Sequence, residues 1–220
     1  MYKSIFLALS ICLVGVSCNK NAINRVATQQ ETISKPKPKE TPTTAKAEIL
    51  AFQKKLNEDY KNPDTSPLGA EASAFMGHEF FPIDLTYRVK AKFEAYKLED
   101  FFTIPTSGPR EAVYRKFGLL TFKIAGKKHH LTVYQNRDLI RNPIYKNYLF
   151  LPFTDATNGN STYGGGRYID MSIPKGKTVI LDFNQAYNPY CAYVDGYSCP
   201  IPPAENDLDI AVEAGIMLKQ

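Results

Sequence analysis

The sequence has 220 residues and a formal net charge of +5, which fits one domain with attachments or at most two small domains. Most of this charge lies near the N-terminus: residues 1–17 carry +1, residues 19–44 carry +3, and residues 45–220 carry only +1. A nearly neutral domain argues against nucleic acid as a partner, because binding to phosphates depends on clustered basic side chains.

Residues 1–17 predict a signal peptide. One lysine precedes an apolar run from Ile5 to Val16. A run of this length suits a secretory signal and is too short to span a bilayer as a mature helix. It ends in Ser17-Cys18, which resembles a bacterial lipoprotein cleavage site, although Gly15 stands where such signals usually have leucine. The alternative is an ordinary secretory signal followed by a chance cysteine.

We favour the lipoprotein, with Cys18 as the acylated first residue of the mature chain. The protein would then be anchored in a bacterial cell envelope, with the membrane as its partner through the N-terminal lipid. No acidic residue follows the cysteine at once, as in some surface-export signals, so we expect the chain to face the periplasm.

Residues 18–44 predict a disordered tether. The stretch after the cysteine is rich in Lys, Pro, Thr, Gln and Asn and almost free of large apolar side chains. It cannot bury enough surface to fold, and "KPKPKETP" favours an extended polyproline II conformation. Residues 45–220 are then expected to form a single globular domain, whose first segment, "AKAEILAFQKKLNEDYKNP", has the apolar spacing of a helix.

The rest of the domain reads as strands. "YRVKAKFEAY" alternates apolar and charged residues, and "AVYRKFGLLTFKIAGKKHHLTVYQN" predicts two strands joined by a tight turn at residues 125–128. "YLFLPF" and "KTVILDF" suit core strands, while "NDLDIAVEAGIML" fits either a closing strand or a short helix. The fold class is therefore mainly β: an antiparallel β barrel or sandwich with an N-terminal helix, preceded by the tether.

Several long motifs resemble a known family. They are "SPLGAEASAF", "LPFTDATNGNSTYGGGRYIDM", "LDFNQAYNPYCAYVDGYSCPIPPAEN" and "AVEAGIM". Over residues 47–217 the chain resembles the family catalogued as domain of unknown function 1684. The resemblance implies no activity, because none is assigned to that family. Its closing motif commonly ends Ala-Gly-Glu-Lys, so any role of that glutamate would be missing here, where Ile216 and Met217 stand instead.

The loop within residues 154–171 is the first candidate site. Three consecutive glycines allow backbone N–H groups to approach a ligand, and the guanidinium that follows suits a carboxylate or phosphate. The candidate ligand-binding residues here are Thr157, Tyr163, Gly164, Gly165 and Arg167. The alternative is a long hairpin loop whose side chains bond its own backbone, with Arg167 paired to Asp170 or Asp182.

The second candidate stretch is "LDFNQAYNPYCAY", which adds Asn184 and Asn188 as ligand-binding candidates. Candidate acid–base residues are Asp155, Asp182 and Glu205, although capping turns or pairing with Arg167 explains any one of them more simply. Both stretches leave apolar strands, so we expect them to meet in a shared pocket. Arg167 would face that pocket, and Asp182 and Asn184 would form its floor.

Cys191 and Cys199 are expected to form a disulfide, because they lie in an exported chain and lack the nearby histidine of a nucleophile or the tight spacing of a zinc site. His129 and His130 are adjacent on a strand, so they point to opposite faces and cannot easily share a metal ion. We therefore predict no metal and no cofactor. Tyr163, Tyr168, Tyr187 and Tyr190 lie inside the two motifs and are candidates to line a pocket.

Two functions remain open. The first is a binding domain for an unknown small polar or anionic molecule. The second is a cofactor-independent hydrolase that uses Asp155, Asp182 or Glu205 as acid or base. We favour binding, because no motif of known catalytic mechanics is present.

Overall fold

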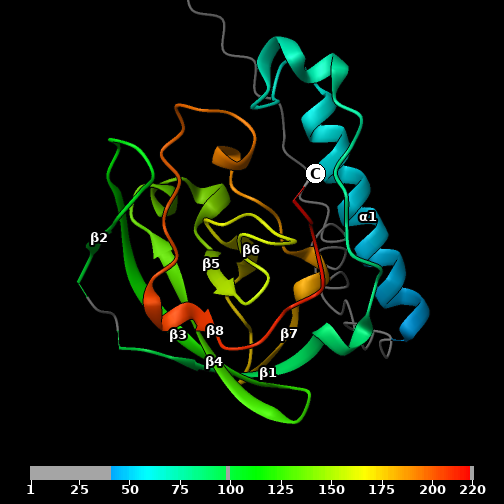
Figure 1. The fold of residues 1–220 in the computed structure, drawn as a ribbon. Coiled ribbons are helices and arrows are strands. Elements are labelled where there is room, and N and C mark those ends of the chain that lie inside the picture. The colour runs from blue at the N-terminus through cyan, green and yellow to red at the C-terminus, as the bar shows by residue number, and fades with distance from the viewer. Residues whose placement is uncertain (1–40, 98–99, 219–220) are drawn as a thin grey trace, which may run out of the picture. The chain divides into compact units, whose positions relative to one another are not determined.

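The computed structural model describes residues 41–97 and 100–218 (Figure 1). The predicted signal peptide, Cys18 and the tether as far as residue 40 lie outside the described residues. The first element is helix α1 (Pro42–Lys61), which begins three residues before the predicted start of the domain. Its N-terminus is stabilised by a capping box, in which the side chains of Thr41 and Thr44 accept each other's backbone N–H groups. In the described part of the chain, no helix is both long and apolar enough to span a membrane.

Eight strands of the described residues form one sheet. They are β1 (Arg88–Ala95), β2 (Phe102–Ile104), β3 (Ala112–Ile124), β4 (Lys127–Asn136), β5 (Tyr148–Asp155), β6 (Arg167–Ser172), β7 (Thr178–Asp182) and β8 (Asp207–Leu208). Short 3-10 helices lie before β1 and between later strands: Gly69–Ala74, Leu85–Tyr87, Leu139–Arg141, Pro143–Tyr145, Phe183–Gln185, Tyr190–Ala192 and Ala204–Asn206.

The sheet runs in the order β6-β5-β4-β3-β1-β7, and each of these neighbours is antiparallel. β2 pairs with β3, and the two-residue β8 lies parallel to β5. The sheet is curled into a half-barrel, with α1 beside it (Figure 1). The predicted fold class is confirmed: the domain is mainly β, antiparallel, and has an N-terminal helix.

The β3–β4 hairpin shows how local sequence shapes this curl. Its turn consists of Ala125 and Gly126, both with positive φ (48° and 80°), so it is shorter than predicted, and Lys127 already pairs with Ile124. In the middle of β3 the register shifts next to Gly118. A Cβ atom there would lie 2.5 Å from the ring of Phe93, so glycine allows the close approach of β1.

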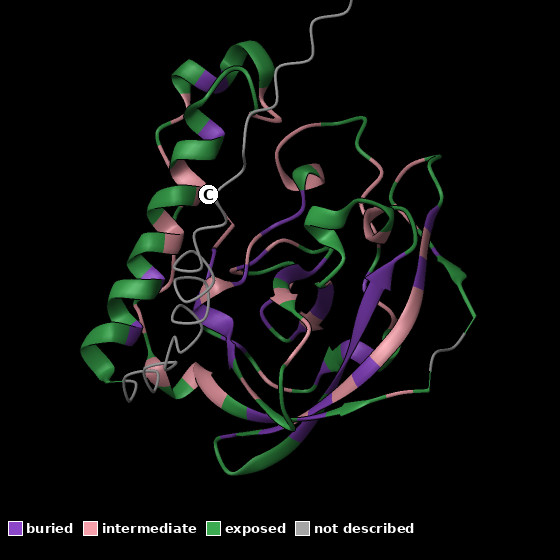
Figure 2. Ribbon diagram, turned by 180° about the vertical axis from the view of Figure 1, so that it is seen from behind, coloured by how far each residue is buried: buried purple, intermediate pink, exposed green. Residues whose placement is uncertain are grey.

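The two faces of β5 and β6 pack against different clusters. Leu149, Leu151 and Ile169 belong to the main core, whereas Phe150 and Tyr168 belong to a second cluster on the opposite face. This follows from the strand period of two, since successive side chains point to opposite faces. The buried residues concentrate along these strands, while the outer surface of α1 is exposed (Figure 2).

The segment after β8 closes the main core. Of the segment that the sequence left open as strand or helix, only Asp207–Leu208 form a strand, which is β8. The rest is irregular chain that buries Val212, Ala214 and Ile216. Gly215 has φ 80°, and a Cβ atom there would lie 2.6 Å from the carbonyl oxygen of Phe183. The tight packing explains why glycine is needed at this point.

Candidate functional site

The glycine-rich loop is bonded to itself. Asp155 Oδ1 accepts hydrogen bonds from the backbone N and the hydroxyl of Thr157, at 2.9 and 2.5 Å. Thr157 is buried, and its hydroxyl also contacts that of Thr162 at 2.7 Å. Gly164 and Gly165 are exposed, and a Cβ atom on Gly165 would lie 2.5 Å from the Tyr163 ring. The alternative reading, a hairpin loop that satisfies its own polar groups, therefore describes this geometry.

Arg167 is fully buried and faces the core rather than a pocket. Its Nη2 donates to Asp155 Oδ2 and to the carbonyl of Val212, both at 2.8 Å, and its Nη1 donates to the carbonyl of Ala214 at 2.5 Å. The guanidinium carbon also lies 5.2 Å from the centre of the Phe153 ring. The side chain is 0% exposed, so a ligand cannot reach it. Arg167 instead ties the C-terminal segment to β5.

Asp182 and Asn184 are also structural in this geometry. Asp182 pairs with Arg88 at 2.5 Å, and Arg88 reaches Glu48 of α1 at 2.6 Å. Asn184 bonds both the Asp182 carboxylate and the backbone carbonyl of Asp84. These contacts fix α1 to the sheet. The shared pocket predicted between Arg167, Asp182 and Asn184 is not formed. The three side chains are engaged by the hydrogen bonds and ion pairs above, and they line neither of the two pockets described below.

Glu205 also lies outside the two pockets described below. Its carboxylate accepts from Tyr134 at 2.7 Å and pairs with Lys116 at 2.8 Å. Partial burial alone would raise the pKa of Glu205, but the hydrogen bonds from Lys116 and Tyr134 outweigh it and lower the pKa. Glu205 is therefore ionised near neutral pH and engaged by its neighbours.

The main pocket lies on the second face of β5 and β6. Its volume is about 730 Å³, within the range of small-molecule sites. Its walls come from α1, from strands β3 to β6, and from a segment that we call the strap, residues 187–201. Seven tyrosines line it: Tyr60, Tyr114, Tyr148, Tyr168, Tyr187, Tyr190 and Tyr197. Three of the four tyrosines named from the sequence are among them, and Tyr163 is not.

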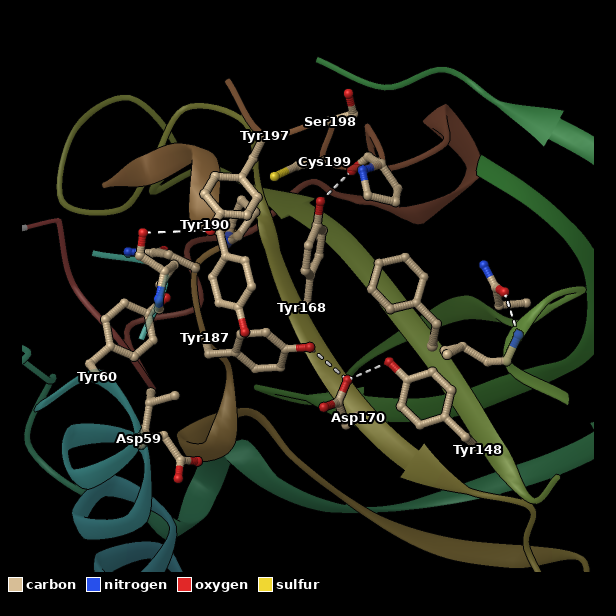
Figure 3. Close-up of a pocket in the computed structure, with 18 of the residues that line it drawn as sticks. Asp59, Tyr60, Tyr148, Tyr168, Asp170, Tyr187, Tyr190, Tyr197, Ser198 and Cys199 are labelled. Atoms are coloured by element: carbon tan, nitrogen blue, oxygen red, sulfur yellow. Dashed lines mark hydrogen bonds between the residues drawn. The ribbon is translucent and has the colours of Figure 1, made fainter. Parts of the chain in front are cut away.

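Asp170 lies among these tyrosines (Figure 3). Its Oδ1 accepts hydrogen bonds from the hydroxyls of Tyr187, at 2.6 Å, and Tyr148, at 2.7 Å. Asp170 is exposed to solvent, although the protein atoms packed around its carboxylate displace part of the water. This burial raises the pKa of Asp170, and the two tyrosine hydrogen bonds offset part of the rise. Burial and the nearby carboxylate also raise the pKa of Tyr148 and Tyr187, so both keep their protons.

The strap is held at both ends. Tyr187 exchanges two backbone hydrogen bonds with Tyr168 of β6, at 2.9 and 3.0 Å. At its other end the strap is closed by the Cys191–Cys199 disulfide, which confirms the predicted pairing. Ser107, in the β2–β3 loop, donates its backbone N–H to the carbonyl of Cys199 at 2.9 Å. Rigid attachment of the strap fixes the positions of the tyrosines that it carries.

Asn188 is the one predicted ligand-binding residue that lines the main pocket. It is 1% exposed, and its amide donates to the hydroxyl of Tyr193 at 3.1 Å. Its Oδ1 has no hydrogen-bond partner. Since that atom is covered, Asn188 supports the wall of the pocket rather than contacting its contents.

A second, smaller hollow of about 430 Å³ lies beside His78 and Tyr193. Burial lowers the pKa of His78 to about 4, so its ring is neutral at physiological pH. His129 is buried, with its ring against Phe122, whereas His130 is exposed, as expected for neighbours on a strand. Within residues 41–97 and 100–218 there is no group of three or more potential metal ligands.

Sequence reasoning offered Asp170 as a partner of Arg167. The two residues are three positions apart in β6, and an odd spacing places them on opposite faces. By the same rule Tyr168 and Asp170 share a face of β6, and this spacing is the sequence pattern that could have indicated the pocket around Asp170. The contributions of Asp59 and Tyr60 had no such signal, because α1 reaches the pocket only through tertiary packing.

Fold and site together define a curled β domain with a tyrosine-lined pocket between sheet, helix and strap. The model of the family described as "Protein of unknown function (DUF1684)" matches residues 73–217, and the chain belongs to this family. An uncharacterized protein of Haloarcula marismortui, solved in solution by NMR, is 32% identical, with a TM-score of 0.62. The match covers 80% of this chain and 95% of that one. No curated protein matches the chain.

Proposed function

We propose that this chain is an exported lipoprotein that binds a small polar molecule in the tyrosine-lined pocket. Acyl chains on Cys18 would anchor it in a bacterial cell envelope, facing the periplasm. The signal-like residues 1–17 and the basic tether support this placement. The Cys191–Cys199 bond supports it independently, because disulfides persist in oxidising compartments outside the cytoplasm.

The observation that carries the binding proposal is Asp170 beside seven tyrosines in a pocket of about 730 Å³. A few polar groups among apolar walls orient a bound molecule. The sequence left polar and anionic ligands open, and the pocket favours a polar one. Of its two cationic side chains, Lys55 pairs with Asp59 at 2.7 Å and Arg110 donates to the carbonyl of Ser198 at 3.0 Å.

The hydrolase alternative receives no support from the three carboxylates chosen for it. A general acid or base must come within hydrogen-bond reach of its substrate. Asp155, Asp182 and Glu205 are each engaged by an arginine or lysine, and none of them lines the main pocket. Binding therefore stays the better proposal.

A thermal-shift screen of the mature protein against a metabolite library tests the proposal. A ligand at 100 times its Kd stabilises the folded state by about 2.7 kcal/mol. The blocking variant is Leu56→Trp, because Leu56 lines the pocket from α1 and the larger ring would fill it. We expect a ligand to raise the Tm of the wild type and to lose this effect in Leu56→Trp.

The matched control is Leu50→Trp on the same helix. Leu50 is 56% exposed and does not line the pocket, so this variant should respond as the wild type does. A ligand effect that survives Leu56→Trp would place binding elsewhere. A library without any stabilising compound would also count against the proposal.

A further inference from the structure

The charge in the main pocket is unbalanced around Asp170. Among the described residues, Asp170 has no ion-pair partner, and both of its protein hydrogen bonds end on Oδ1. In Figure 3 the second carboxylate oxygen points away from Tyr148 and Tyr187 and takes part in no drawn hydrogen bond. Oδ2 therefore offers a negatively charged acceptor to whatever enters the pocket.

The two hydroxyls in contact with Asp170 have already donated their protons. A tyrosine hydroxyl has one proton to donate, and Tyr148 and Tyr187 both donate theirs to Oδ1. The hydroxyl of Tyr168 donates to the carbonyl of Pro200. No recorded hydrogen bond from the described residues reaches Oδ2, so an occupant that bonds this atom has to supply the proton.

The walls around this acceptor are aromatic faces. Tyr190 lies 5.2 Å from Tyr197 and 6.1 Å from Tyr60, ring centre to ring centre, and both pairs are edge-to-face. Tyr187 meets Tyr168 in the same way at 5.9 Å. Ring faces attract cations through their quadrupole, and the attraction grows when the cation is shielded from water.

We propose that the main pocket binds an organic ammonium, meaning a protonated primary or secondary amine. Its N–H groups donate to Asp170 Oδ2, and its carbon skeleton lies between the tyrosine rings. The proposal rests on the proposed binding function and names its ligand class. An anion is disfavoured at this place, because it would face a carboxylate of the same charge.

The affinity for an amine should depend on pH in a defined direction. The charge of Asp170 is needed for binding, so affinity is present above the pKa of Asp170 and is lost as pH falls through it. Because burial raises that pKa, the loss should begin at a higher pH than for an exposed aspartate. Lys55, Asp59, Arg110 and Asp138 also line the pocket, and because their two positive and two negative charges cancel, Asp170 leaves the lining with a net negative charge.

Calorimetry with three probes of one shape tests the ligand class: benzylamine, benzyl alcohol and benzoate. We expect the mature wild-type protein to bind benzylamine at least tenfold more tightly than the other two. Asp170→Asn keeps the size of the side chain and removes its charge, so its affinity for benzylamine should fall about tenfold or more, a change of about 1.4 kcal/mol. The control is Asp195→Asn, because Asp195 is exposed on the strap and lies outside the pocket lining.

The two proposals fail in different ways. If benzoate or benzyl alcohol binds as tightly as benzylamine, or if Asp170→Asn binds benzylamine unchanged, the ammonium proposal is overturned. A neutral or anionic library compound that Leu56→Trp excludes would overturn it too, while leaving the proposed function intact. If no probe and no library compound binds, both proposals fail.

Discussion

Arg167 illustrates how a charged residue in a motif can serve the fold. Its guanidinium contacts Asp155 and the carbonyls of three residues in the closing segment, Val212, Ala214 and Ile216. Both members of the ion pair have fully buried side chains. Removing one member of such a pair is costly, because the other charge is left in a poorly solvated place.

We therefore expect Arg167→Ala to lower the free energy of unfolding by about 3–5 kcal/mol. Urea denaturation of the purified mature protein measures this. Arg167→Lys should lose less, since it keeps the charge but cannot reproduce the forked contacts. The control is Arg141→Ala: the Arg141 side chain is 76% exposed, and its removal should cost at most about 1 kcal/mol.

An opposite result would restore the ligand-binding role that the sequence suggested for Arg167. In that case Arg167→Ala would unfold at the same urea concentration as the wild type and yet lose ligand-induced stabilisation. The burial of the side chain argues against this outcome.

At the residue scale, sequence reasoning succeeded where a residue's neighbours along the chain decide its place. Tyr168, Tyr187 and Tyr190 lie in the two polar motifs and line the pocket, as predicted. It did not succeed where the partner is distant. No local pattern shows that Asp155 accepts a hydrogen bond from the backbone of Val212, or that Asp182 forms an ion pair with Arg88. Such pairings depend on tertiary packing.

At the scale of elements, alternation was a reliable guide for strands. β1 lies in the stretch where apolar and charged residues alternate, the β3–β4 hairpin lies where two strands and a turn were predicted, and β5 and β7 lie in the short apolar runs predicted as core strands. The closing segment could not be assigned, because its course is set by carbonyl contacts with Arg167 and by tight packing at Gly215, not by any repeating pattern. The strap likewise owes its position to its attachments.

The prediction at the scale of elements concerns the disulfide that closes the strap. Closing a loop of this length with a disulfide stabilises a protein by roughly 2–3 kcal/mol on the chain-entropy model. We expect the double variant Cys191→Ala/Cys199→Ala to have a free energy of unfolding lower by that amount. It should also bind pocket ligands more weakly, because Tyr190 and Tyr197 are then less firmly held. Urea denaturation and calorimetry measure the two effects.

The reductant dithiothreitol supplies the control for this prediction. It should lower the free energy of unfolding and the ligand affinity of the wild type, and it should leave both quantities unchanged in the double variant. Two free thiols in the alkylated but unreduced protein, seen by mass spectrometry, would show that the bond does not form.

For the whole molecule, the prediction concerns its attachment. Cys18→Ser removes the sulfur that would carry the lipid, so the protein should leave the membrane fraction or remain unprocessed. Cell fractionation with mass spectrometry of the N-terminus measures this. Cys12→Ser is the matched control, because Cys12 lies inside the expected signal and its loss should leave the anchor in place. Equal membrane retention of Cys18→Ser would contradict the proposed lipoprotein.

The disulfide in the strap also affects when the protein becomes able to bind its ligand. The bond that steadies two of the pocket's tyrosines forms in oxidising surroundings and not in a reducing cytoplasm. A newly synthesised chain that has not yet been exported would have an incomplete pocket wall and a low affinity for its ligand. Delivery to the envelope would then act as the step of activation. The cell could make the protein in the presence of cytoplasmic amines without sequestering them.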